Sequence, residues 1–232
     1  LAHELGYLLV LSKNGKKMDL RGVHKLHAMG VQYQKTDLLY ISPSKGGKST
    51  HFIELLKDPE VKIYSDDTPI IDDRGNLFPF PLRIGTEDKL RLPDFIDKEE
   101  IYELERRTYG KKYLIPLKAL SHTIADHKDS KRVVVVYGRR SNKSLPKIKP
   151  LSKFYTFMIF GKFLIVGVGL PMILEYFLES GMKDLWKRTK IVLKRVRAST
   201  KLLMKAETYE MEMSKDVSKN TEILKGLLKG KL

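Results

Sequence analysis

The stretch from residue 36 to residue 65 restricts the fold of this chain more than any other. The apolar run TDLLYIS leads into the small residues PSKGGKS, and a second apolar run, VKIYS, ends the stretch. Between them, the spacing of apolar residues in KSTHFIELLK predicts a helix with one buried face, formed by Phe52, Leu55 and Leu56. The order strand, glycine-rich loop, helix, strand predicts an α/β fold in which the loop follows a sheet strand.

The loop carries residue types that suit a phosphate. Gly46 and Gly47 let the backbone close around phosphate oxygens without a Cβ in the way. Lys48 is then expected to contact the β- and γ-phosphates, and the hydroxyl of Ser49 to ligate Mg²⁺, with Thr50 as a second hydroxyl. The pattern therefore predicts a site for a nucleoside triphosphate, although a chance run of small residues is the alternative.

One position departs from the phosphate-loop pattern G-x-x-x-x-G-K-[ST]. Ser42 stands where that pattern has its first glycine, and a small polar residue fits there if its φ is negative. The nucleotide-binding residues predicted from the sequence are Ser42, Pro43, Ser44, Lys45, Gly46, Gly47, Lys48, Ser49 and Thr50.

Two adjacent carboxylates, Asp66 and Asp67, follow the second strand of this unit. Strands that run in the same direction end at the same edge of a sheet, so these side chains are expected beside the loop. One carboxylate would hold Mg²⁺ together with Ser49, and the other would accept the proton of an attacking hydroxyl. An Asp-rich turn that only caps the following segment is the alternative.

The segment HAMGVQYQKTDLLYISPSKGGKSTHFIELL, followed by YSDDTPIID, resembles the HPr kinase/phosphorylase family. That family shares its nucleotide site with the phosphoenolpyruvate carboxykinases. It has a His before two strands, a loop of the type G-x-S-x-x-G-K-[ST] and an Asp-Asp pair after the next strand. The similarity covers roughly residues 24–73 and is weaker at FPFPLRIG and at the late strand.

The resemblance implies a mixed sheet around a P-loop and assigns roles to individual residues. Asp67, or alternatively Asp66, would be the base, and His27 would lie beside the transferred phosphoryl group, with His24 as a rival for that place. The family's glycine-rich signature with its metal-binding Glu has no clear counterpart here. The resemblance therefore indicates a divergent member, for which phosphorylase activity and HPr docking are in doubt.

The remaining segments predict further elements. DDRGN predicts a hairpin, KEEIYELERR a helix, the four valines of SKRVVVVYGRR a buried strand, and 141–152 a linker. The apolar segment 154–178 predicts two buried helical pieces broken at GVGLP, since Lys162 and the glycines weaken a membrane-spanning interpretation. A basic amphipathic helix (183–205), a strand (208–213) and a last helix (217–229) complete the chain.

These elements suggest two regions, a kinase-like core at 1–150 and a C-terminal helical subdomain at 151–232 whose late strand returns to the core. Lys and Arg outnumber Asp and Glu by 44 to 28, a net charge of +16. Such a surplus is most simply a solvated basic surface, but it also leaves open contact of 154–205 with a membrane surface. Arg83, Arg139 and Arg140 are candidate phosphate clamps.

The absence of cysteine excludes disulfides and thiolate metal sites and favours the cytoplasm, with membrane association as the alternative. The chain begins at Leu1 rather than Met, so a preceding piece is expected. The leading hypothesis is a kinase that uses ATP, or another nucleoside triphosphate, and Mg²⁺ to phosphorylate a protein serine or a small-molecule hydroxyl. The alternatives are a nucleotide-binding regulator without transfer, and a basic protein that binds a membrane or, less favoured, nucleic acid. Homo-oligomers are known in the family that the chain resembles.

Overall fold

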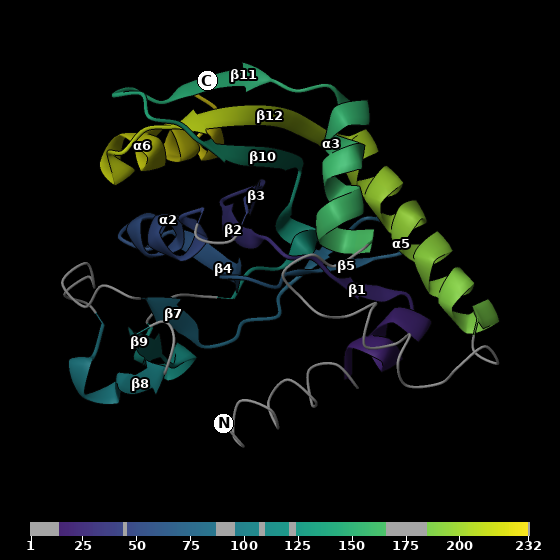
Figure 1. Cartoon of the computed structure of the whole chain (residues 1–232), viewed down its shortest axis with the longest axis horizontal. Coiled ribbons are helices and arrows are strands. Elements are labelled where there is room, and N and C mark those ends of the chain that lie inside the picture. Colours follow the sequence, from purple (N-terminus) through teal and green to yellow (C-terminus); the bar gives the residue numbers. More distant parts are fainter. Residues whose placement is uncertain are drawn as a thin grey trace.

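A six-stranded mixed sheet lies at the centre of an α/β fold (Figure 1). The computed structural model describes residues 14–43, 46–86, 96–106, 110–120, 124–165 and 185–231. In spatial order the strands of this sheet are β11 (Lys147–Pro150), β12 (Ala206–Met213), β10 (Arg132–Arg140), β3 (Thr36–Ile41), β2 (Met29–Tyr33) and β4 (Val61–Ser65).

The strand directions decide where the candidate site lies. β10 is parallel to both β3 and β12, whereas β2 is antiparallel to both β3 and β4. β4 therefore runs in the same direction as β3, with β2 between them. In consequence, the ends of β3 and β4 and the start of β2 meet at one edge of the sheet. β2 and β3 form a hairpin, with Gln34 in its turn at a φ of 51°.

Helices cover both faces of the central sheet. α2 (Lys48–Leu55) and α6 (Val217–Leu228) pack on one face, where the predicted apolar face of α2 joins the core with side chains of β3 and β10. α3 (Lys153–Phe160), the π-helical turn η5 (Gly161–Ile165) and α5 (Leu185–Lys205) cover the other face. Figure 1 shows these two layers on opposite sides of the sheet.

Two small sheets flank the central one. The first pairs β1 (Val23–Lys25), β5 (Ile70–Asp72) and β6 (Leu77–Phe78), and its β5–β6 hairpin confirms the turn predicted at DDRGN. The second pairs β7 (Ile84–Thr86), β9 (Gly110–Ile115) and β8 (Tyr102–Arg106).

The helix predicted over KEEIYELERR is wrong. Only the short 3-10 turn η2 (Lys98–Glu100) is helical there, and Tyr102–Arg106 is strand β8. The helical interpretation rested on Ile101 and Leu104, but Tyr102 and Leu104 also fit the alternation of a strand. Pairing with β9 decides between the two patterns, because strand formation depends on its neighbours more than on local preference.

The C-terminal third joins the main sheet directly. The expected late strand is β12, which lies inside the sheet between β10 and β11. The segment predicted as a linker also contains strand β11, a short edge strand with lysines and a terminal proline, as edge strands often have. Of the predicted helical pieces in 154–178, α3 and η5 are present, and the residues after 165 lie outside the described residues. No helix in the described ranges is both long enough and apolar enough to span a bilayer.

Candidate functional site

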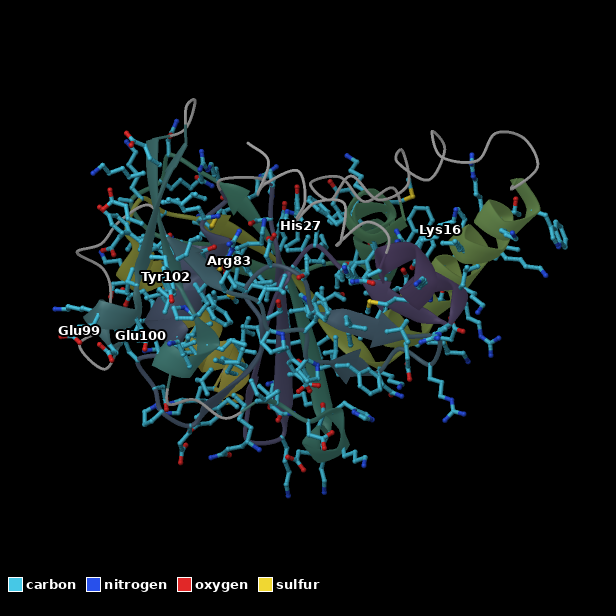
Figure 2. The ribbon with its side chains drawn as sticks, turned by 90° about the horizontal axis from the view of Figure 1, so that it is seen from below. Lys16, His27, Arg83, Glu99, Glu100 and Tyr102 are labelled. Atoms are coloured by element: carbon cyan, nitrogen blue, oxygen red, sulfur yellow. The ribbon has the colours of Figure 1, made fainter. Side chains whose placement is uncertain are left out.

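Three segments that the sequence separates meet at one edge of the central sheet. The loop after β3 leads into α2, Asp66 and Asp67 follow β4, and His27 precedes β2. Because β2 runs against both neighbours, its first residues lie beside the last residues of β3 and β4: Met29 pairs with Tyr40, and Gly30 with Ser65. Figure 2, turned by 90° from Figure 1, labels His27 near the middle of the molecule.

The loop between β3 and α2 turns tightly. The backbone N–H of Gly46 donates to the carbonyl oxygen of Pro43 over 2.9 Å. A Cβ at Gly46 would clash with Oγ of Ser42 and lie 2.7 Å from that carbonyl oxygen, so a larger residue cannot keep this turn. Gly47 has a φ of +78°, a conformation that glycine adopts without steric cost.

Ser42 is fully buried at the start of the loop. Its φ is not positive, because Gln34 is the one non-glycine residue with positive φ in the described part of the chain. Its hydroxyl donates to the carbonyl oxygen of Gly46 over 3.3 Å. The condition for a small polar residue at this position is therefore met. The predicted loop residues Ser44 and Lys45 lie outside the described residues.

Lys48 begins α2, and its side chain folds back over the loop. Its Nζ donates to the carbonyl oxygen of Ser42 over 3.0 Å. Burial lowers the pKa of Lys48, and the carboxylates of Asp67 and Asp66 oppose this change. Gly47 offers α2 no capping side chain, so the N–H groups of the first turn, including that of the half-buried Thr50, are available to an anion.

Ser49 and Asp66 are in contact. The hydroxyl of Ser49 donates to Oδ2 of Asp66 over 3.1 Å. Oδ1 of Asp66 is buried and has no hydrogen-bond partner in the described part of the structure. Burial raises the pKa of Asp66 to about 7, and the neighbouring charge of Asp67 raises it as well. The protonated and ionised forms of this carboxyl group are therefore both populated near neutral pH.

Asp67 and His27 face each other at the same edge. Oδ1 of Asp67 lies 3.2 Å from Nδ1 of His27, and the Asp67 side chain is 49 % exposed while that of His27 is 9 % exposed. The two side chains are in contact, but the geometry does not make a hydrogen bond, so Nδ1 has no hydrogen-bond partner among the described residues. Burial lowers the pKa of His27; Asp67 opposes this change and Lys48 adds to it. Burial therefore favours the neutral imidazole.

His24, the rival candidate, belongs to a different cluster. Its Nδ1 lies 2.8 Å from Oδ1 of the buried Asp19, and its Nε2 lies 3.0 Å from Oδ1 of Asp73. Arg195 on α5 donates to both oxygens of Asp19, over 3.0 and 2.6 Å. Burial alone would raise the pKa of Asp19, but the bonds from His24 and Arg195 hold it below its usual value. This cluster joins His24 and Asp19 to α5, and of the two histidines it is His27 that lies beside Asp67.

Two residues near Asp66 were not identified from the sequence. The backbone N–H of Gly85 on β7 and the ammonium of Lys112 on β9 both favour the ionised form of Asp66. The Lys112 side chain crosses over Gly85, where a Cβ would clash with it. The resemblance at FPFPLRIG was a weak signal for Gly85. Lys112 had no signal, because its strand and its pairing with β7 depend on the tertiary fold.

The three candidate arginines lie differently. Arg139 at the end of β10 is already paired, with Glu212 at 3.1 Å and Glu210 at 3.6 Å. Arg140 lies at the same edge, close enough to lower the pKa of Tyr40, while burial raises it more. Arg83 precedes β7, and Figure 2 shows it on the side of the molecule that carries Tyr102.

The arrangement can be tested for a fit to Mg²⁺. No group of three or more His, Asp or Glu side chains in the described ranges is arranged to hold a metal ion on its own. Mg²⁺ in nucleotide sites, however, keeps several waters and binds through one or two carboxylates and the phosphates. The unpartnered Oδ1 of Asp66 and the hydroxyl of Ser49 fit this kind of site.

The chain was compared with known proteins. No protein-family model matches the sequence, and no curated protein matches it. The case for a function therefore depends on the geometry of this edge.

Proposed function

We propose that the protein is a phosphotransferase that uses a nucleoside triphosphate and Mg²⁺, of the HPr-kinase-like type. It would transfer the γ-phosphoryl group to a hydroxyl of a protein serine or of a small molecule. One observation carries the proposal: Lys48, Ser49, Asp66, Asp67 and His27 converge at one edge of the sheet, with a glycine turn and a helix N-terminus beside them.

The loop and α2 would bind the phosphates. The backbone N–H groups of the residues after Gly47 lie at the N-terminus of α2, where the helix dipole adds positive potential. Lys48 would leave the carbonyl oxygen of Ser42 and donate to phosphate oxygens instead. Because Lys48 is 8 % exposed, the attraction of its ammonium group for the phosphates would be weakly screened by water.

Asp66 and Ser49 would hold Mg²⁺, which neutralises charge on the phosphates during transfer. A bound cation favours the ionised form of Asp66, and this would offset the effect of burial that raises its pKa. Ser49 would rotate its hydroxyl hydrogen away from Asp66 so that its oxygen could face the ion.

Asp67 is the better candidate for the base, because its side chain is half exposed and can reach an incoming acceptor. The acceptor oxygen would form a bond to the γ-phosphorus, and the bond from that phosphorus to the β–γ bridging oxygen would break. The acceptor proton would pass to Asp67, and His27, whose Nδ1 lies 3.2 Å from Oδ1 of Asp67, would orient that carboxylate.

The test is transfer of labelled γ-phosphate from ATP, with Mg²⁺, to acceptors in fractionated cell extract. We expect a labelled product with the full chain and at least a hundredfold less with Lys48→Ala or Asp67→Asn, since positioned charges and bases are each worth about that much. Lys57→Ala, on the exposed side beyond α2 and paired with Glu54, is the matched control. Equal labelling by Lys48→Ala would refute the proposal. Nucleotide binding by calorimetry without any transfer would favour the regulator instead.

A further inference from the structure

We propose that the outer face formed by α3 and α5 is a docking surface for an anionic lipid bilayer. The surface consists of exposed apolar side chains with lysines and an arginine between them. Its apolar members are Phe154, Tyr155 and Met158 on α3 and Trp186, Leu193 and Met204 on α5. This inference is independent of phosphoryl transfer.

The apolar residues of α5 lie along one line on the side that faces away from the sheet. Trp186 and Met204 are separated by 18 residues, which is five helical turns of ~3.6 residues, and Leu193 lies about two turns after Trp186. They are 69 %, 65 % and 60 % exposed. The opposite side of α5 is buried against the core through Ile191, Ala198, Leu202 and Leu203. The exposed apolar side chains of this line are therefore not part of the core that α5 packs against.

α3 extends this line at the end of α5. Nζ of Lys153 donates to the carbonyl oxygen of Met204 over 2.9 Å, which places the start of α3 beside the last turn of α5. Phe154, at 76 % exposure, is the most exposed of the large apolar residues in the described part of the chain. Figure 1 shows α3 and α5 packed together at one side of the molecule. The apolar line on α5 is about 27 Å long, at ~1.5 Å per helical residue, and the exposed apolar residues of α3 begin beside its last turn.

The charge of the surface selects the partner. α5 carries eight Lys and Arg residues and no Asp or Glu, and α3 contains no acidic residue either. Lys190, Arg197 and Lys201 are exposed and follow the apolar line on one side. The ammonium of Lys190 lies 5.4 Å from the centre of the Trp186 ring. Lysines beside exposed aromatic residues are the arrangement by which amphipathic helices bind anionic headgroups while the apolar side chains enter the acyl boundary.

Other partners fit this surface less well. Two copies of the chain that met face to face through it would bring like charges together, which opposes association. Nucleic-acid interfaces are polar, whereas the exposed side chains of Leu193, Met158 and Met204 form no ion pair or hydrogen bond with a phosphate backbone. An anionic bilayer uses both the positive charge and the projecting apolar groups.

The test is co-flotation of the full chain with vesicles of phosphatidylcholine, with and without added phosphatidylserine, at low and high salt. We expect binding to the anionic vesicles and at least about tenfold weaker binding at high salt or to the neutral ones. Phe154→Ala with Trp186→Ala should lower binding at least about tenfold, because each removes a large apolar side chain that the bilayer would otherwise bury. Tyr102→Ala with Leu145→Ala, exposed residues elsewhere, should not.

Charge variants provide the second arm. Lys190→Glu with Lys201→Glu should reduce binding to anionic vesicles about tenfold or more, whereas Lys98→Glu with Lys215→Glu, which changes the net charge equally, should leave it within twofold. Circular dichroism melting checks that every variant is folded. The proposal would be overturned if both pairs of charge variants lost vesicle binding equally, or if the full chain bound neutral vesicles as strongly as anionic ones. So would binding to an oligonucleotide without vesicle binding, or a dimer in sedimentation that Phe154→Ala dissociates.

Discussion

Ser49 and Asp66 are 17 positions apart, and the hydroxyl of the first donates to the carboxylate of the second over 3.1 Å. Ser49 lies in the first turn of α2, and Asp66 directly follows β4. This contact joins the two halves of the candidate site. It also leaves the other oxygen of Asp66 buried and without a hydrogen-bond partner in the part of the chain that the structure describes.

Replacing Gly46 with alanine should disrupt the loop. The new Cβ would clash with Oγ of Ser42 and lie 2.7 Å from the carbonyl oxygen of Pro43. We expect Gly46→Ala to lower the free energy of unfolding by about 1–3 kcal/mol, as overpacking usually does, and to weaken nucleotide binding. Urea denaturation and calorimetry measure both. Gly161→Ala, where nothing lies within 4 Å of the new Cβ, should leave both unchanged; a similar loss there would contradict the explanation.

The two histidines should respond differently to substitution. His24→Ala leaves Asp19 buried with one fewer partner, so we expect the free energy of unfolding to fall by about 2–4 kcal/mol. His27→Ala should cost about 1 kcal/mol, since Nδ1 makes no hydrogen bond, but should strongly reduce phosphoryl transfer. Chemical denaturation together with the transfer assay separates the two effects. Equal destabilisation by both variants would show that His27 is structural too.

Stability should depend on the protonation of Asp66. Its pKa is about 7 in the folded chain against an ordinary value of 3.8, so between these values the folded state holds a proton that the unfolded state has released. This contribution to stability is present at low pH and is lost as the pH rises toward 7, by up to about 1.4 kcal/mol per pH unit.

Asp66→Asn should remove this slope, and the difference between the wild-type and variant unfolding curves measured from pH 4 to 8 reports it. Asp37, whose pKa burial raises to about 6, contributes to both curves and cancels in the difference. Parallel curves would show that Asp66 does not titrate in this range. A saturating concentration of Mg²⁺ with ATP should flatten the wild-type curve, because the ion favours ionised Asp66.

Lys112 should support ligand binding from a separate strand. Lys112→Met removes a cation that favours the ionised form of Asp66, and we expect about five- to tenfold weaker binding of Mg²⁺ with ATP. Lys111→Met is the matched control, because the side chain of Lys111 is adjacent in sequence but pairs with Glu103. Titration calorimetry measures both. If the two variants bind alike, Lys112 has no part in the site.

The parts of the fold that the sequence predicted are those with local signals. β3, α2 and β4 follow one another within 30 residues, and their apolar spacing predicts each element and the approach of Asp66 to the loop. The β8 strand was missed because Ile101 and Leu104 fit a helix equally well before β9 is known to pair with it. Likewise, Arg195 binds Asp19 across 176 positions, and a single sequence contains no local signal that predicts contact between residues so far apart.

The position of β2 has a consequence for how such a site can be built. Neighbouring strands lie ~4.8 Å apart, and β2 lies between β3 and β4, so the ends of β3 and β4 are separated by ~10 Å. An antiparallel strand that starts in this gap brings the residues just before it, here including His27, between the glycine turn and the acid pair. A chain with this strand order therefore has a position just before the middle strand from which a side chain reaches both neighbouring strand ends. Substitution of that one side chain can change the chemistry at this edge while the backbone stays unchanged.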